Sequence, residues 1–177
     1  QPHYLYSPRE LTRWKVALHE AIKNVEGMTE ENIIRLLVHE ALRIFVDRLV
    51  FTEEREWSEE QLDSSVLQEF SCNKDILRRP ILFSCYLNQD SHYVSVEREQ
   101  LRAFVQEKLR VFYEEELAVH LVIFDEVLDH IVRMDRVLRQ PLGHLLLVGA
   151  SGAGKTVLSK FVSWMNGLTV YMLKVGR

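Results

Sequence analysis

The feature that most constrains the fold is a change of pattern at residue 142. Before it, apolar residues recur with helical spacing. After it comes a continuous apolar run, 145–148, and then the glycine-rich segment 149–156. Such a run is typical of a parallel strand buried on both faces. With a helical stretch at 157–166 and a second apolar run at 168–173, the pattern predicts the opening strand, loop, helix and strand of an α/β nucleotide-binding domain.

The glycine-rich segment Gly-Ala-Ser-Gly-Ala-Gly-Lys-Thr matches G-x-x-x-x-G-K-[ST] at every defined position. Its glycines permit positive φ and close approach of the backbone to phosphates. Successive N–H groups and the positive end of the next helix can then hold the anion. We expect Lys155 to reach the β- and γ-phosphates and the Thr156 hydroxyl to ligate Mg²⁺. The predicted residues for binding ATP or ADP with Mg²⁺ are Gly149, Ala150, Ser151, Gly152, Ala153, Gly154, Lys155, Thr156 and Val157.

No catalytic residue for hydrolysis is predicted within the chain. Hydrolysis also requires an acid for Mg²⁺ and a group that positions water. In phosphate-loop enzymes that acid lies downstream of the loop, whereas the apolar run that ends at Asp125-Glu126 lies upstream. Helical spacing continues beyond these two acids, so they are interpreted as the solvated face of a helix. The chain alone is predicted not to turn over ATP.

The part before residue 142 is predicted to be mostly helical. Ser7-Pro8-Arg9-Glu10 is a complete helix start, with a hydroxyl cap, a proline at the first helical position and a glutamate three residues after the cap. Thr29 can cap a second helix, whose apolar stripe comprises Ile34, Leu37, Val38, Ala41, Phe45 and Leu49. Residues 58–61 form another capping-box pattern, which predicts a shorter helix towards Phe70.

An irregular connector is expected over residues 71–94, where 81–83 is the strand candidate. Helical spacing returns from about Val96, with Leu101, Phe104, Val105, Leu109, Phe112 and Leu117 as its apolar positions. A further helix is expected from about Val119 to Arg139. The overall fold class is therefore mostly α followed by α/β.

Composition narrows the function classes. The chain is 47% hydrophobic with a net charge of −4, and its charges are interleaved. This predicts a packed core and argues against a nucleic-acid partner, which needs a concentrated basic face. No apolar run reaches the ~18 residues of a membrane span, and no signal sequence is apparent. Cys72 and Cys85 are expected to be free thiols of an intracellular protein, with a disulfide as the alternative.

The chain resembles cytoplasmic dynein heavy chains over essentially its whole length. Residues 143–149, Lys155-Thr156 and 161–168 are similar to the start of the fourth AAA+ module of that family. Residues 112–117 and 124–130 resemble the segment leading into it. Upstream, 79–84 resembles the connector between modules, and 3–14 resembles the start of the small helical subdomain of the third module.

The resemblance implies three regions: a helical lid subdomain at 1–75, a connector and helix at 76–118, and the start of the next large subdomain at 119–177. It also implies that Arg9 is a sensor arginine for the nucleotide of the preceding module, with Arg13 less favoured and a surface ion pair as the alternative role.

At the level of function, the resemblance implies part of the ATPase ring of a minus-end-directed microtubule motor that serves retrograde transport and carries a coiled-coil stalk elsewhere. Implied partners are the microtubule, a second heavy chain, other dynein subunits and dynactin, in the cytoplasm on the cytoskeleton. Two other interpretations stay open: a different phosphate-loop ATPase with a helical N-terminal domain, and a non-enzymatic helical module with a relic loop.

Overall fold

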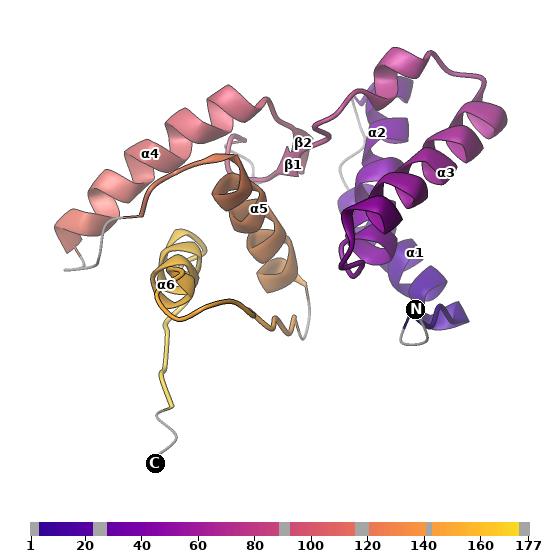
Figure 1. Cartoon of the computed structure of the whole chain (residues 1–177). Coiled ribbons are helices and arrows are strands. Elements are labelled where there is room, and N and C mark those ends of the chain that lie inside the picture. The colour runs from indigo at the N-terminus through magenta and orange to yellow at the C-terminus, as the bar shows by residue number, and fades with distance from the viewer. Residues whose placement is uncertain (1–3, 23–27, 89–92, 116–120, 141–142, 174–177) are drawn as a thin grey trace. The chain divides into compact units, whose positions relative to one another are not determined.

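The computed structural model describes residues 4–22, 28–88, 93–115, 121–140 and 143–173. The chain divides into two compact units, Gln1–Ser95 and Val96–Arg177, which are described separately below (Figure 1). This division falls inside region 76–118, which the resemblance implies is a connector and helix. The three-region organisation of the chain stays a prediction.

The first unit is a helical bundle with one short hairpin. It contains α1 (Pro8–Ile22), α2 (Glu30–Ala41), the π-helix η1 (Leu42–Val46), α3 (Thr52–Phe70) and the 3-10 helix η2 (Lys74–Leu77). Both α1 and α3 pack against the nearly continuous α2–η1 helix (Figure 1). Strands β1 (Phe83–Ser84) and β2 (Val94–Ser95) pair in antiparallel register, Phe83 with Ser95 and Ser84 with Val94.

The two helix starts predicted at Ser7 and Thr29 are confirmed. The Glu10 carboxylate accepts hydrogen bonds from the Ser7 N–H and the Ser7 hydroxyl, both at 2.7 Å. Thr29 accepts one from the Asn32 N–H at 3.3 Å. These contacts satisfy donors that the first turn of a helix leaves without intrahelical partners.

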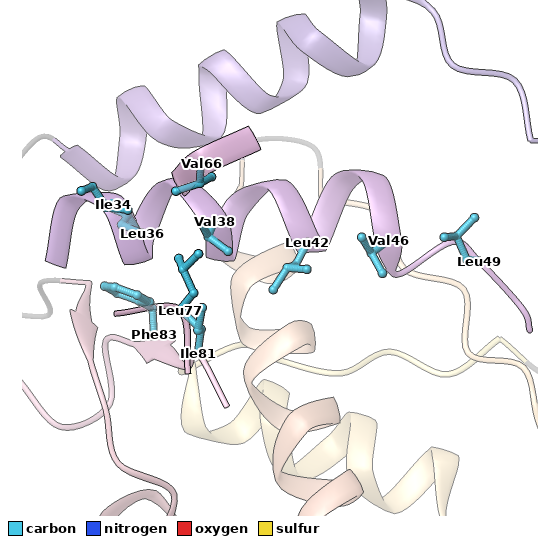
Figure 2. Close-up of a cluster of buried hydrophobic side chains, with 10 residues drawn as sticks. All are labelled: Ile34, Leu36, Val38, Leu42, Val46, Leu49, Val66, Leu77, Ile81 and Phe83. Carbon is cyan, nitrogen blue, oxygen red and sulfur yellow. The ribbon is translucent and has the colours of Figure 1, made fainter. Parts of the chain in front are cut away.

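The core of the first unit forms around the α2–η1 helix. The predicted stripe is confirmed at Ile34, Val38, Ala41 and Leu49, whereas Leu37 and Phe45 are half-buried. The Asp47 N–H donates to the Leu42 carbonyl at 3.0 Å, the bond of a π-turn. Leu42 and Val46 take the core positions at this turn. Figure 2 shows the resulting cluster of Ile34, Leu36, Val38, Leu42, Val46, Leu49, Val66, Leu77, Ile81 and Phe83.

Helix α3 begins earlier than the sequence predicted. It begins at Thr52 and not at Ser58, so the start expected at 58–61 is wrong and Ser58 lies inside the helix. Glu53 and Glu54 place negative charge in the first turn, which favours a helix start there. Val66 is the buried residue of this helix, and Trp57 is 63% exposed. The helix therefore covers the core with a narrow contact and presents most of its surface to solvent.

The segment after α3 is held on α2 by polar side chains. The buried His39 ring contacts the Ile81 carbonyl through Nδ1 at 3.0 Å and the Tyr93 hydroxyl through Nε2 at 2.8 Å. Arg35 donates to the Ile76 carbonyl at 2.6 Å. The connector is thus irregular, as predicted, and includes a strand that begins within the candidate 81–83. Cys72 and Cys85 are both thiols and not joined in a disulfide, as predicted.

The second unit consists of α4 (Arg98–Glu115), α5 (Asp125–Arg139) and α6 (Lys155–Met165), and each of the three helices packs against the other two. The predicted core positions Leu101, Val105, Leu109 and Phe112 of α4 are buried, and Phe104 is half-buried. Leu117 and Val119 lie outside the described residues. The expected start of α5 near Val119 is wrong, because residues 121–124 carry no helix assignment and the helix begins at Asp125.

The two strands predicted around the phosphate loop are not formed. Residues 143–150 and 168–173 carry no strand assignment. A strand requires a hydrogen-bonded neighbour, and within the described part of the chain β1 pairs with β2 and no further sheet is present. Leu146 and Val148 are 85% and 86% exposed, and Leu173 is 95% exposed. The two apolar runs therefore carry no regular secondary structure, because they lack the partners that would make them strands.

Candidate nucleotide-binding site

The predicted phosphate loop turns directly into α6. Gly152 and Gly154 adopt positive φ values of 82° and 74°, a region that favours glycine. The Ala153 N–H donates to the Ala150 carbonyl at 3.3 Å, closing a turn. Gly154 is the N-cap of α6, and its carbonyl accepts the first helical bond, from the Leu158 N–H at 2.9 Å. The helix expected after the loop is therefore confirmed.

The amino end of α6 has no side-chain cap. The N–H groups of its first turn lack partners within the helix, and the helix dipole places partial positive charge there. A Cβ added at Gly152 would meet no atom within 4 Å, so the space beside this residue is open. Thr156 is exposed and Val157 is half-buried. This arrangement fits an anion at the helix end and leaves the Thr156 hydroxyl accessible to a metal ion.

The Lys155 side chain lies across the loop. Its Nζ donates to the Gly149 carbonyl at 2.8 Å and to the Ala150 carbonyl at 2.6 Å. The ammonium group is thus already held beside the loop backbone. These are hydrogen bonds to neutral acceptors at an exposed site, so a phosphate oxygen could compete for the same donor.

Aromatic packing anchors α6 against α4. Phe161 is fully buried, with its ring centroid 5.4 Å from that of Phe112. Trp164 stacks beside Phe161 and donates from Nε1 to the Glu115 carboxylate at 2.7 Å. Because α6 carries the loop at its start, this packing fixes the direction in which the loop faces.

A second set of contacts joins α4 to residues 121–124, which have no regular secondary structure. The Leu121 N–H donates to the Tyr113 hydroxyl. Arg102 donates from Nη1 to the Ile123 carbonyl at 2.9 Å and from Nη2 to the Asp125 carboxylate. Arg98 pairs with Asp125 at 3.0 Å and with Asp129 at 3.1 Å.

This cluster was not predicted from the sequence. A signal was present, because Arg98 and Arg102 are four residues apart on one helix, as are Asp125 and Asp129 on another. Four-residue spacing places two side chains on the same helical face, so the two pairs suit each other.

Asp125 and Glu126 lie in the first turn of α5, and both are exposed. The prediction that they belong to a solvated helix face is confirmed. Their position at a helix amino end, with Asp125 paired to arginines, explains why acids stand here.

Arg9 lies in the first turn of α1 and is exposed, as is Arg13 one turn later. In the described part of the chain, no ion pair involves the Arg9 guanidinium. The alternative role of Arg9, a surface ion pair, therefore finds no acidic partner among those residues. No cluster of three or more His, Cys, Asp or Glu side chains suited to a metal occurs among the described residues. Within the same residues, no helix combines the length and apolar character needed to cross a membrane.

Comparison with known proteins agrees with the two-part arrangement of the chain. Residues 1–55 match the family model described as "Dynein heavy chain, ATPase lid domain". Residues 119–177 match the model described as "P-loop containing dynein motor region D4". A helical lid and a phosphate-loop region are parts of an ATPase motor region.

Individual relatives match the chain along its whole length. It is 58% identical over 176 residues to a cytoplasmic dynein heavy chain of Dictyostelium discoideum, covering 99% of this chain and 4% of that protein. The cytoplasmic dynein heavy chain of Paramecium tetraurelia is 57% identical over 178 residues, covering 100% of this chain and 4% of the relative. That of Saccharomyces cerevisiae is 42% identical over 180 residues, with the same two coverages.

The chain belongs to the dynein heavy chain family. It spans about 4% of the length of the curated relatives it matches. The assignment depends on these comparisons, and the loop and helix at 149–165 agree with it. The strand expected before the loop is not paired and does not contribute.

Proposed function

We propose that residues 149–157 bind ATP or ADP with Mg²⁺ in a AAA+ module of a dynein motor region. The observation that carries the proposal is the loop geometry: positive φ at Gly152 and Gly154 leads into an uncapped helix start beside the Lys155 ammonium. Main-chain N–H groups would hold the phosphates, Lys155 would move from its carbonyl partners to the β- and γ-phosphates, and Thr156 would ligate Mg²⁺. Bound Mg²⁺ would neutralise phosphate charge.

The proposal extends to the place of the chain in its parent. The two family models support a lid followed by the fourth module, D4, and we assign the lid to the third module. The chain would then contribute to the ATPase ring of a minus-end-directed microtubule motor. The nucleotide at 149–157 would serve regulation, and this chain by itself would not hydrolyse it. The relatives are described as cytoplasmic. This supports a cytoplasmic, cytoskeletal location with the microtubule, a second heavy chain, other dynein subunits and dynactin as partners.

The test is a titration of the intact heavy chain with Mg-ADP and Mg-ATP, followed by hydrogen–deuterium exchange of peptides within 149–165. A parent with several ATPase modules needs a readout that is resolved by site, and exchange of this peptide supplies it. We expect nucleotide to protect the peptide in the wild type and not in Lys155→Ala. Lys160→Ala, on the same helix but beyond the loop, serves as the charge-matched control and should retain protection.

The outcomes separate the interpretations. Equal and negligible protection in the wild type and Lys155→Ala would support a relic loop in a helical module. Protection that the wild type and Lys160→Ala show and that Lys155→Ala lacks would support nucleotide binding at this loop.

A further inference from the structure

The phosphate loop is contacted by a segment that lies far from it in sequence. A Cβ placed on Gly154 would lie 3.1 Å from the Leu121 Cδ2 atom, closer than most side chains tolerate. The Leu121 side chain therefore lies directly against the residue at which the loop turns into α6. This contact depends on glycine at position 154 and on the placement of residues 121–124.

Residues 121–124 have no secondary structure of their own. A segment that belongs to no helix or sheet needs other partners for its backbone polar groups. Here α4 supplies them at both ends: the Tyr113 hydroxyl accepts from the Leu121 N–H, and Arg102 donates to the Ile123 carbonyl at 2.9 Å. The position of Leu121 is thus set by two side chains of one rigid helix.

Arg102 has a second contact that orients it. Its Nη2 donates to the Asp125 carboxylate, and Asp125 is itself paired with Arg98 at 3.0 Å. Surface ion pairs of this kind contribute little to stability. The planar guanidinium can, however, hold a carbonyl and a carboxylate at once in fixed geometry, which lysine cannot do. The cluster is therefore better suited to fixing a segment than to stabilising the fold.

We propose that Arg102 is a positioning residue for the phosphate loop: it holds the Ile123 carbonyl so that Leu121 stays against Gly154. The consequence for nucleotide affinity rests on the function proposed above, whereas the positioning of the loop does not. Loosening this contact would let the turn at Gly154 fluctuate, and the first-turn N–H groups would lose their fixed direction towards the anion.

Arg98 provides a matched control. It lies one turn before Arg102 on α4 and pairs with Asp125 and Asp129. Within the part of the chain that the structure describes, its guanidinium does not contact the backbone of residues 121–124. Arg98→Gln and Arg102→Gln each remove one positive charge from the same cluster. The Ile123 carbonyl loses its donor only in the second variant.

The test measures hydrogen–deuterium exchange in the intact heavy chain, first without nucleotide and then with increasing Mg-ADP. Without nucleotide, Arg102→Gln should raise exchange in peptides covering residues 149–154, and Arg98→Gln should not. With nucleotide, the midpoint of Mg-ADP protection should shift to higher concentration by roughly two- to thirtyfold in Arg102→Gln, the range for residues that influence a site without touching the ligand. Arg98→Gln should stay within about twofold of the wild type, since it leaves the segment held.

Two further variants test the route of the effect. Leu121→Ala should raise loop exchange by itself, and the double variant Leu121→Ala with Arg102→Gln should add little, because both act through one contact. Arg102→Lys should fail to restore the wild-type exchange, since it loses the second donor.

Equal exchange of the loop in Arg98→Gln and Arg102→Gln would overturn the inference, as would full additivity in the double variant. A wild type that Mg-ADP does not protect would overturn the proposed function. The exchange without nucleotide would still decide whether Arg102 positions the loop.

Discussion

The Glu10 carboxylate is held by Ser7 through two hydrogen bonds of 2.7 Å, one from the hydroxyl and one from the backbone N–H. These bonds favour the charged form and lower the pKa of Glu10 from 4.5 to about 2. Arg48, 3.6 Å away, adds a smaller electrostatic contribution in the same direction. The start of α1 thus depends on an ionised side chain.

We predict that Glu10 makes the stability of the first unit depend on pH in the acid range. A group with a lowered folded-state pKa contributes stability above its unfolded value, and this contribution is lost as pH falls through the folded value. The free energy of unfolding of the wild type should exceed that of Glu10→Gln by a constant amount above about pH 5. This difference in the free energy of unfolding should shrink as the pH falls from the ordinary pKa of 4.5 to the folded-state pKa of about 2.

Urea unfolding followed by circular dichroism would measure both proteins from about pH 7, above the unfolded-state pKa, down to about pH 2, where the folded-state pKa lies. Glu60→Gln, an exposed position on α3, is the control and should show no such convergence. A difference between the wild type and Glu10→Gln that persists undiminished at the lowest pH would contradict the prediction.

The two positive-φ glycines of the loop should respond differently to alanine. Both Gly152→Ala and Gly154→Ala force a side chain into the left-handed region, at a cost of about 1–3 kcal/mol. At Gly154 the new Cβ also lies 3.1 Å from Leu121, whereas at Gly152 it meets nothing within 4 Å. Gly154→Ala should therefore destabilise the second unit more than Gly152→Ala.

Gly149→Ala completes the series. Gly149 does not have positive φ, and its nearest neighbours are Lys155 side-chain atoms at 3.8 and 3.9 Å. The free energy of unfolding of the Gly149→Ala variant should therefore stay close to that of the wild type. Chemical denaturation of the three variants would rank them, and Gly152→Ala as the most destabilised would contradict the contact with Leu121.

Helix α6 should depend on Phe161 for its attachment. This side chain is fully buried between α4 and α6 and packs against Phe112. Phe161→Ala should lower the free energy of unfolding by about 3–5 kcal/mol, the usual cost of removing a buried aromatic side chain. Val111→Ala, at an exposed site on α4, should change it by less than about 0.5 kcal/mol. Unfolding followed by tryptophan fluorescence of Trp164, which stacks beside Phe161, would report the loss.

Local sequence signals predicted the start of a helix correctly where one capping residue determines that start. Ser7 and Thr29 cap their helices as expected, because the Ser7 hydroxyl accepts from the Arg9 N–H and the Thr29 hydroxyl accepts from the Asn32 N–H. The start at Ser58 failed because the same pattern inside a helix looks identical in sequence, and the acids at 53 and 54 favour an earlier start. The π-turn at 42–46 was not predicted, since it shifts the buried face without leaving a separate sequence signal.

Non-local structure was the harder part of the site. The loop and the helix after it follow from glycines and from helical spacing, both of which are local. The runs at 145–148 and 168–173 were predicted as strands from their apolar character, but strand formation depends on hydrogen-bonded partners that local sequence does not specify. The contact between Leu121 and Gly154 was missed for the same reason, because 33 residues separate the two positions (154 − 121).

Arg9 should affect the nucleotide of the preceding module if it is the sensor arginine that the resemblance implies. Its side chain is exposed in the first turn of α1, so it is accessible to the phosphate of a nucleotide bound to another part of the parent protein. Arg9→Ala in the intact heavy chain should weaken protection of the phosphate loop of that module by Mg-ATP more than by Mg-ADP. Arg13→Ala, one turn further along, should have the smaller effect. Equal effects of the two variants would assign Arg9 a general electrostatic role.

The exposed apolar runs at 145–148 and 168–173 should make the isolated chain self-associate. Val148 is 86% exposed, Tyr171 87% and Leu173 95%, and neither run belongs to a sheet within the described residues. Exposed apolar strand-like segments offer a template for pairing with another copy. Sedimentation velocity of the 177-residue chain should therefore show association that increases with protein concentration.

Leu146→Lys with Leu173→Lys should reduce the association, because lysine on an unpaired segment opposes intermolecular pairing. Far-ultraviolet circular dichroism should be unchanged in the double variant, since neither residue lies in a helix. A well-behaved monomer at all concentrations would mean that these runs are covered within the chain itself.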